Sequence, residues 1–322
     1  MNTVSINGQT FKIPQRWDEL TVTQFRAMVR IIDETPLYTE ARLLFFLVFT
    51  GIRIVRVENG ELRVENSYQF RYRKQTFYML AWQFVEIIKL FDWIFVSETN
   101  KKNENTGHYA VECRLTRNLL PFIRVPRFSL FHSPLSILNS QLSGPSDGLT
   151  NLRFSEYIYA ETEHAKYLDT AKEAHLSRMI AVLYRPVRRV NTHSTDWNGD
   201  YRQPFNPYHT TRIARMAARL PVTTRHMILM WYEGCQLMLM SRFPDTFCRI
   251  PERKKKPRSE VFQSFMQMVN ALSADDVTRK DAVRDAFLYD ALSTINEMCR
   301  RQAELEAKYP ELKKGNKKVH HS

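Results

Sequence analysis

Basic side chains are concentrated in one stretch of this chain, from Arg185 to Arg258. The stretch carries twelve Arg and three Lys against five acidic residues, which accounts for +10 of the net charge of +13 over all 322 residues. A local excess of cationic side chains can bind phosphate backbones or acidic protein surfaces. The first chemistry that the sequence suggests is therefore the binding of a polyanion.

Three arginines of this stretch have helical spacing. Arg212, Arg215 and Arg219 lie three and four positions apart, so a helix would place them on one face. That face could straddle phosphates or acidic side chains, or it could be a solvated or ion-paired face of the helix. The candidate polyanion or partner patch also includes the remaining clustered basic groups, of which the last five could equally form a linker: Arg185, Arg188, Arg189, Arg253, Lys254, Lys255, Lys256 and Arg258.

Aromatic side chains are interleaved with the basic stretch. They could stack on nucleic-acid bases, although core packing and loop anchoring are the more frequent roles of such residues. They are Tyr184, Trp197, Tyr201, Phe205 and Tyr208. Arg outnumbers Lys by 31 to 16 in the chain, and Arg with Tyr and Trp is typical of protein interfaces.

Two short motifs resemble those of tyrosine recombinases. The apolar run that ends at Thr50-Gly51-Ile52-Arg53 is similar to their first catalytic box, in which the Arg binds the scissile phosphate. His209-Thr-Thr-Arg212 matches the letters of their HxxR helix. The later His or Trp and the tyrosine nucleophile should follow on two further helices, but His226, Trp231 and Tyr232 all fall within the next one. We therefore expect no recombinase activity.

Other catalytic and cofactor motifs are missing from the sequence. It contains no GxxxxGK[ST], GxGxxG, GxSxG or HExxH pattern. The cysteines are scattered without a CxxC pair, which favours buried thiols over a disulfide framework or a zinc site. They are Cys113, Cys235, Cys248 and Cys299. We predict that the protein is not an enzyme and holds no cofactor or metal.

The first third of the chain alternates between strand and helix signals. Two hairpins are predicted, around Asn7-Gly8 and, over 52–65, around Asn59-Gly60. Thr21 and Gln24 have the spacing of a capping box that starts a helix over 21–33. Further predicted elements are a helix over 39–50 ended by Gly51, a long buried helix over 75–95 and weak strands within 111–130.

The remainder reads as helical after a dense turn signal at 143–148. Helical patterns cover 154–168, 173–184, 208–220, 224–242, 260–272 and 278–308. These signals predict an α+β fold that is mostly α, with small antiparallel hairpins in the N-terminal part and an all-helical C-terminal part. The predicted division is an α+β domain over 1–145, a basic helical domain over 146–251, and a basic linker with C-terminal helices over 252–322.

The ends and the apolar runs bear on location. The N-terminus lacks a charged segment followed by an apolar core, so we expect no signal peptide. The longest apolar run, over 43–52, is far shorter than the roughly 18 to 20 residues that cross a bilayer. We therefore expect no membrane partner and a location in a cytoplasm.

Several segments together resemble morphogenesis proteins from phages and prophages of Bacteroidetes. The opening Ile13-Pro14-Gln-Arg-Trp17-Asp-Glu-Leu20-Thr21-Val-Thr-Gln24 is similar to their IPxxWxxLTxxQ start, and later segments agree in order: 144–154, 179–186 and 220–235. The resemblance implies a virion or tail-assembly protein without catalytic residues, whose partners are other phage tail, connector or capsid proteins. Its location would be the host cytoplasm during assembly, or the virion. The basic stretch keeps open an alternative, a virion-associated protein that binds DNA or another nucleic acid.

Overall fold

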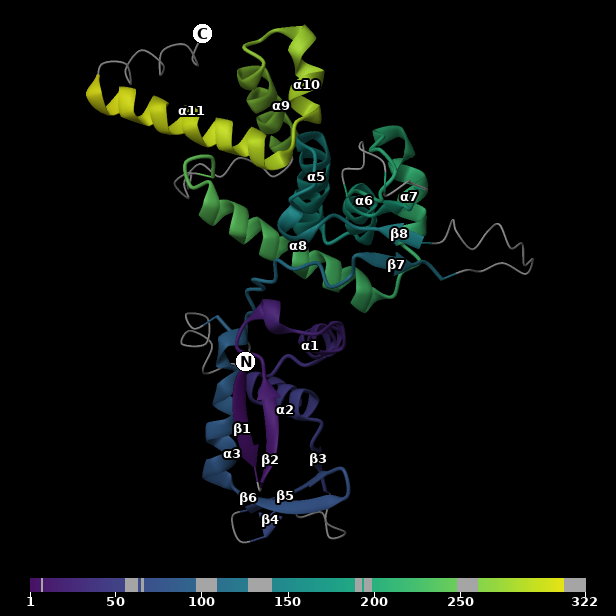
Figure 1. Ribbon diagram of the computed structural model, residues 1–322, viewed down its shortest axis with the longest axis vertical. Helices are drawn as coiled ribbons and strands as arrows, with labels where there is room; N and C mark the ends of the chain where they lie inside the picture. Colours follow the sequence, from purple (N-terminus) through teal and green to yellow (C-terminus); the bar gives the residue numbers. More distant parts are fainter. Residues whose placement is uncertain are drawn as a thin grey trace, which may run out of the picture. The chain divides into compact units, whose positions relative to one another are not determined.

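The computed structural model describes residues 1–6, 8–55, 63–64, 67–96, 109–126, 141–188, 193, 199–247 and 260–309. Helices predominate, and the N-terminal part carries small antiparallel sheets (Figure 1). This confirms the α+β, mostly α, fold class. Within the described residues, no helix has the length and apolar character needed to cross a membrane.

The chain forms two compact units. The first comprises Met1–Leu119 with Val222–Gly234, and the second comprises Leu120–Pro221 with Cys235–Ser322. Helix α8 (Val222–Arg242) contributes residues to both. The division at 145 and 251 that the turn and charge signals suggest stays a prediction.

The first unit begins with a hairpin of β1 (Asn2–Ile6) and β2 (Gln9–Ile13), in register from Ile6↔Gln9 to Asn2↔Ile13. Gly8 has a φ of 76°, which a residue with a Cβ rarely adopts. The turn that the sequence predicted lies partly outside the described residues, because Asn7 is not among them. The hairpin is followed by the 3-10 turn η1 (Trp17–Glu19).

Helices α1 (Val22–Glu34) and α2 (Tyr38–Thr50) form the core of this unit, and the start of α1 and the end of α2 confirm the predicted signals. The Gln24 amide donates to Thr21 Oγ1 at 3.2 Å, and the Thr21 amide donates to Gln24 Oε1 at 3.0 Å, which completes the capping box. Gly51 ends α2 with a φ of 69°.

The next sheet corrects two predictions. Strands β3 (Arg53–Ile54) and β4 (Arg63–Val64) both pair with β5 (Ser67–Tyr72) instead of with each other, and Asn59-Gly60 lies outside the described residues. The predicted helix over 75–95 begins as β6 (Gln75–Leu80), which also pairs with β5. Phe77 and Met79 of β6 are buried while their neighbours are exposed, so a period of two overrides the helical spacing there.

The helical part of that segment is short. It consists of α3 (Ala81–Ile88) and the 3-10 helix η2 (Lys89–Ile94). Phe91 and Ile94 are buried in the core with Phe45, Phe46 and Phe49 of α2. Edge-to-face and stacked aromatic pairs therefore stabilise the packing of this unit, as between Phe49 and Phe91 with 5.5 Å between ring centroids.

The second unit is built on helices. They are α5 (Phe154–Thr170), α6 (Glu173–Leu183), α7 (Thr210–Ala217), the end of α8, α9 (Val261–Leu272), α10 (Lys280–Asp285) and α11 (Leu288–Lys308), with the 3-10 turns η5 (Asp147–Leu149), η6 (Pro207–His209) and η9 (Val277–Arg279). A small antiparallel sheet has the order β7 (Phe122–Arg124), β8 (Gln141–Ser143), β9 (Arg185–Pro186). β7 confirms a strand within 111–130. β9 corrects the prediction of an all-helical C-terminal part, because Arg185–Pro186 pairs with β8.

Candidate partner-binding surfaces

A buried charge network in the second unit contains Arg185, the first member of the predicted basic patch. Its Nη2 donates to Glu156 Oε1 at 2.7 Å, and its Nη1 donates to the Val182 carbonyl at 2.7 Å. The other carboxylate oxygen of Glu156 lies 3.1 Å from Nη1 of Arg202, which also binds Asp200. The Arg185 and Arg202 residues are each 2% exposed. Arg185 therefore cannot belong to a surface patch, because the fold itself uses its charge.

The pKa values of Arg202 and Asp200 show that attraction between the charged groups outweighs burial in this network. Burial lowers the pKa of Arg202, but Glu156 and Asp200 outweigh burial and hold that pKa above its ordinary value. Burial raises the pKa of Asp200, but hydrogen bonds from Arg202 outweigh it and hold that pKa below its ordinary value. Arg202 and Asp200 therefore stay charged at neutral pH, and Arg202 fastens the 199–203 segment to α5 through Glu156.

Arg188 is also drawn into the fold. Its Nε and Nη2 donate to the carbonyl oxygen of Asp200 at 3.1 and 3.0 Å. It lines a hollow of about 230 Å³ beside Arg185 and Arg153. Like Arg185, it positions the 199–203 segment, so the sequence patch contains two arginines with structural contacts.

The predicted arginine row is on α7 and the turn that follows it. Arg212, Arg215 and Arg219 are exposed, while Ile213 and Ala217 on the opposite face are buried. Among the residues that the structure describes, no acidic side chain pairs with any of the three. Tyr208, just before α7, is 91% exposed. We name Tyr208 with these three arginines the α7 surface.

The rest of the predicted patch cannot be placed. Its remaining members lie outside the described residues: Arg189, Arg253, Lys254, Lys255, Lys256 and Arg258. The same holds for Trp197 and Cys248. The structure therefore groups only the arginines of the α7 surface.

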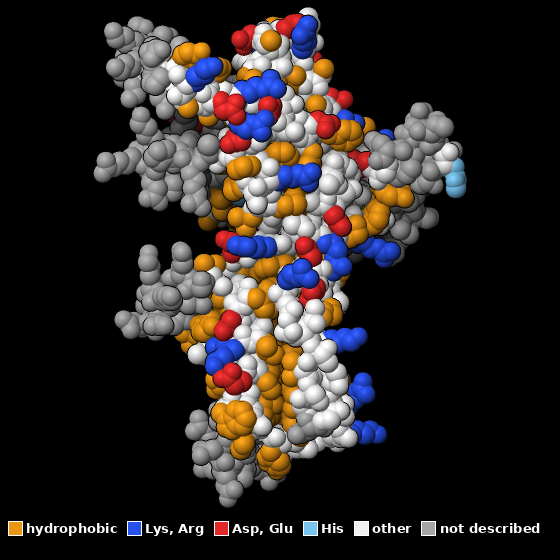
Figure 2. All heavy atoms as spheres, turned by 60° about the vertical axis from the view of Figure 1, so that its left-hand side comes forward, with side chains coloured by type: hydrophobic (Ala, Val, Ile, Leu, Met, Phe, Trp, Pro, Cys, Tyr) orange, Lys and Arg blue, Asp and Glu red, His pale blue; other side chains and the backbone are white. Residues whose placement is uncertain are grey.

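A different surface, in the first unit, exposes large apolar side chains around the start of α3. Tyr78 is 55% exposed, Leu80 43%, Trp82 65% and Val85 45%, and we name these residues the α3 surface. Hydrophobic side chains gather on the face of this unit that carries α3 and the first hairpin (Figure 2). Neighbouring apolar groups of this extent mark sites of protein contact in soluble proteins.

A groove of about 340 Å³ runs beside Trp82 and Tyr78. Its lining includes Val4 and Ile6 of β1, Met79 of β6 and Ile87 of α3. Among the described residues, β1 pairs with β2 alone, so its other edge carries no strand. Ile6 and Gln9 face each other beside the two-residue turn, where a hairpin has a hydrogen-bonded pair. Hydrogen-bonded and non-hydrogen-bonded pairs alternate along the strands, so the peptide groups of Thr3 and Ser5 point away from β2 toward this edge.

Sequence reasoning missed the α3 surface because it predicted a buried helix over 75–95. One signal could have revealed it. Trp82, Val85, Glu86 and Lys89 follow the spacing of a single helix face, and the opposite charges of Glu86 and Lys89, three positions apart, mark that face as solvated. An exposed Trp on a solvated face is then the exception that points to a partner.

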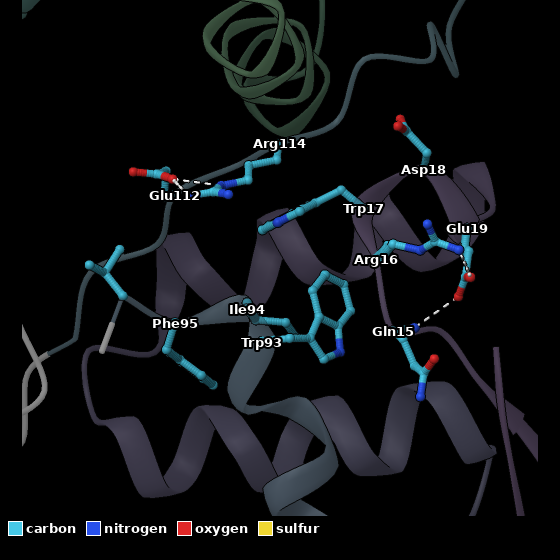
Figure 3. A pocket seen from close by; sticks show the side chains of 11 residues that line it. Gln15, Arg16, Trp17, Asp18, Glu19, Trp93, Ile94, Phe95, Glu112 and Arg114 are labelled. Carbon is cyan, nitrogen blue, oxygen red and sulfur yellow. Dashed lines mark hydrogen bonds and ion pairs between the residues drawn. The ribbon is translucent and has the colours of Figure 1, made fainter. Parts of the chain in front are cut away.

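A hollow of about 880 Å³ lies in the first unit around Trp17 and Trp93 (Figure 3). The two indole rings meet edge to face with 5.5 Å between centroids. The acidic groups at its rim are already bound: Glu19 pairs with the N-terminal ammonium at 2.9 Å, and Glu112 pairs with Arg114 at 2.6 Å. Asp18 accepts from the Thr116 amide at 2.8 Å. The Asp18 contact joins η1 to the 112–117 segment at the rim of the hollow.

Two of the sequence motifs can be compared with the described residues. These residues contain no cluster of His, Cys, Asp or Glu that could hold a metal ion. Tyr232, the nearest match to a recombinase nucleophile, is 0% exposed. Comparison of the chain with protein-family models, curated proteins and solved structures finds no match.

Proposed function

We propose that this chain is a phage virion morphogenesis protein that acts through protein–protein contacts, as a tail or connector assembly factor or as a structural component. The sequence resemblance suggests this class, and one structural observation carries the proposal. It is the α3 surface, where a Trp that is 65% exposed stands beside an apolar groove. Trp is among the residues that dominate the binding energy of protein interfaces.

The groove suggests how a partner binds. The apolar side chains of Val4 and Met79 line it, and the peptide groups of Thr3 and Ser5 border it. An extended segment of a tail, connector or capsid protein would hydrogen-bond to the free edge of β1 and place its apolar side chains against Trp82. Main-chain bonds would supply affinity, and the groove would select the side chains.

Site-specific photocross-linking tests this proposal. Trp82→p-benzoylphenylalanine, produced in phage-infected cells, should cross-link to a tail, connector or capsid protein identified by mass spectrometry. Val277→p-benzoylphenylalanine is the matched control, because Val277 is 75% exposed in the second unit. Cross-links absent at position 82, or equal at both positions, would contradict the proposal.

A second candidate function, nucleic-acid binding, is favoured by the α7 surface. Three exposed arginines without acidic partners among the described residues, next to an exposed Tyr208, fit a phosphate backbone with a stacked base. Arg212→Glu/Arg215→Glu/Arg219→Glu should abolish binding to duplex and single-stranded DNA. If all three arginines contact phosphates, they should together contribute about 2 to 3 to the slope of the logarithm of the wild-type binding constant against the logarithm of the salt concentration. Unchanged DNA binding would mean that the three arginines form only a solvated helix face.

A further inference from the structure

Two arginines face each other across neighbouring strands of the first unit. Arg53 of β3 lies directly opposite Arg71 of β5 in the antiparallel register, and both residues are exposed (Figure 1). Side chains at opposed positions have Cβ atoms roughly 5 Å apart and point to the same face of a sheet. Ile54 and Phe70, next along the two strands, oppose each other on the other face, where Phe70 is 1% exposed. The arginine pair therefore lies on the outer face of this sheet.

The arginine pair has no counter-charge in the part of the chain that the structure describes. Within that part, no acidic side chain pairs with Arg53 or Arg71. The segment 67–80, which forms β5, β6 and the turn between them, contains three basic residues and no acidic one. Like charges directly opposite each other destabilise an antiparallel pair. The sheet therefore keeps an unfavourable arrangement that an anionic ligand would relieve.

The turn between β5 and β6 adds two further basic side chains. Arg73 and Lys74 are exposed, and the pair Tyr72↔Gln75 closes the turn. Arg73 has a φ of 53°, in the left-handed region that Gly and Asn adopt most readily. A cationic side chain thus occupies a position where the backbone favours other residue types, and such departures from local rules are expected at functional sites. We name the basic residues of this sheet and turn the β5 cluster: Arg53, Arg71, Arg73 and Lys74.

The outer face of the sheet connects the β5 cluster to the α3 surface. Arg71 lies opposite Thr76 of β6, and Tyr78, two residues further along β6, projects from the same face. Such a diagonal neighbour lies roughly 7 to 8 Å away, a distance that about three residues of extended chain cover. Tyr78 is also a member of the α3 surface and lines its groove. A short extended segment can therefore contact the groove and the arginine pair together.

We propose that the β5 cluster binds carboxylates of an acidic segment in the same protein partner that occupies the groove beside Trp82. This inference rests on the proposed function, because it names the chemistry of that partner. The segment places apolar side chains on the α3 surface and, a few residues away, Asp or Glu side chains over Arg53 and Arg71. A carboxylate has two acceptor oxygens, so one group between the arginines receives charge-assisted hydrogen bonds from both.

The neighbours of the β5 cluster favour an acidic protein over a nucleic acid. Tyr78 and Trp82 can stack on bases, but the surface between and beyond them is aliphatic, with Leu80 43% exposed and Val85 45% exposed. The free edge of β1 borders the same groove, and its peptide groups match the main chain of an extended protein segment. Carboxylates are the anionic groups that such a segment carries.

Photocross-linking from the sheet tests the proposal and leaves the four basic residues intact. In phage-infected cells, Thr76→p-benzoylphenylalanine should cross-link to the same protein as Trp82→p-benzoylphenylalanine, through a peptide that contains Asp or Glu and has a net negative charge. Thr23→p-benzoylphenylalanine is the matched control, because Thr23 is an exposed threonine of α1 in the same unit, and it should not cross-link to that protein. Cross-links from position 76 to another protein, to a peptide without acidic residues or to nucleic acid would overturn the proposal.

Charge reversal separates this inference from the proposed function. Arg53→Glu/Arg71→Glu should lower the yield of the position 82 cross-link by about tenfold, since it replaces two charge-assisted contacts by repulsion. Arg26→Glu/Arg30→Glu reverses two exposed arginines of α1 in the same unit and should leave that yield unchanged. Equal yields in the two variants would overturn the acidic partner segment and leave the proposed function standing. No partner at position 82 with the β5 cluster intact would overturn both.

Thermal unfolding supplies a readout that needs no partner. Arg71→Gln removes the like charge opposite Arg53, so it should raise the melting temperature at low salt, and the gain should shrink at high salt. Arg124→Gln is the matched control, because Arg124 is exposed on β7 opposite the neutral Gln141 and its replacement should give no such gain. A melting temperature lowered by Arg71→Gln would show that the chain itself supplies a counter-charge to the pair, and the proposal would be wrong.

Discussion

Gly234 of α8 lies directly against the backbone at Leu115. A Cβ atom at Gly234 would lie 2.4 Å from the Leu115 carbonyl oxygen and 2.8 Å from its amide nitrogen. Both residues belong to the first unit. Nearby, Trp231 Nε1 donates to the Thr116 carbonyl at 3.0 Å. The helix can approach this segment so closely only because residue 234 has no side chain.

Gly234→Ala should therefore destabilise the first unit. Ala ordinarily stabilises a helix interior by up to about 1 kcal/mol relative to Gly, but here the added methyl meets backbone that cannot rotate away. We expect a net loss of about 1 to 3 kcal/mol, the range for overpacked cores. Denaturant unfolding followed by tryptophan fluorescence measures it, with the exposed Ser241→Ala on the same helix as control. A stabilised Gly234→Ala variant would contradict the contact.

Glu156→Ala should destabilise the second unit strongly. It would leave Arg185, whose side chain is 3% exposed, without its carboxylate partner, and loss of one member of a buried ion pair costs about 3 to 5 kcal/mol. Asp281→Ala is the control, because it also removes a carboxylate from an arginine, but Asp281 is 92% exposed and its loss should have little effect. Equal effects on the free energy of unfolding would argue against the buried network.

Local sequence signals predicted much of the fold. The Thr21–Gln24 capping box and Gly51 mark helix ends through contacts between near neighbours in the chain, and the structure confirms both. The strands with which β3 and β6 pair do not follow from such local signals. Both strands pair with β5, and that choice depends on which faces become buried together, which spacing within one segment does not specify.

The candidate site shows the same limit. Helical spacing placed Arg212, Arg215 and Arg219 on one exposed face, because that depends only on the helix. Charge counting could not distinguish these from Arg185, whose burial depends on Glu156, 29 positions away in the sequence. The exposure of Trp82 was missed for the same reason, since its neighbours across the unit decide which face of α3 is covered.

Stability of the second unit should depend on Glu163 at acid pH. Burial raises the pKa of Glu163, but hydrogen bonds with His175 and Lys166 outweigh it and hold that pKa below its ordinary value of 4.5. Because the folded pKa is the lower one, this carboxylate contributes stability above about pH 4.5, and the contribution is lost as the pH falls through the folded pKa.

The difference in unfolding free energy between the wild type and Glu163→Gln should therefore be largest near neutral pH and should shrink below about pH 4.5. Glu304→Gln is the control, because Glu304 is 70% exposed on α11. A difference that grows on acidification would contradict a lowered pKa of Glu163 in the folded state.

Cysteine reactivity should follow burial. Burial raises the pKa of Cys113 to about 12, so at pH 8 only about one thiol in ten thousand is the reactive thiolate, and Cys235 is also buried. Cys299 is partly exposed on α11. With iodoacetamide and dilute native protein, mass spectrometry should find Cys299 alkylated well before Cys113 and Cys235, and unfolding in guanidinium should expose all three equally. Alkylation of Cys113 at the rate of Cys299 in the native protein would show that the first unit opens around Gly234.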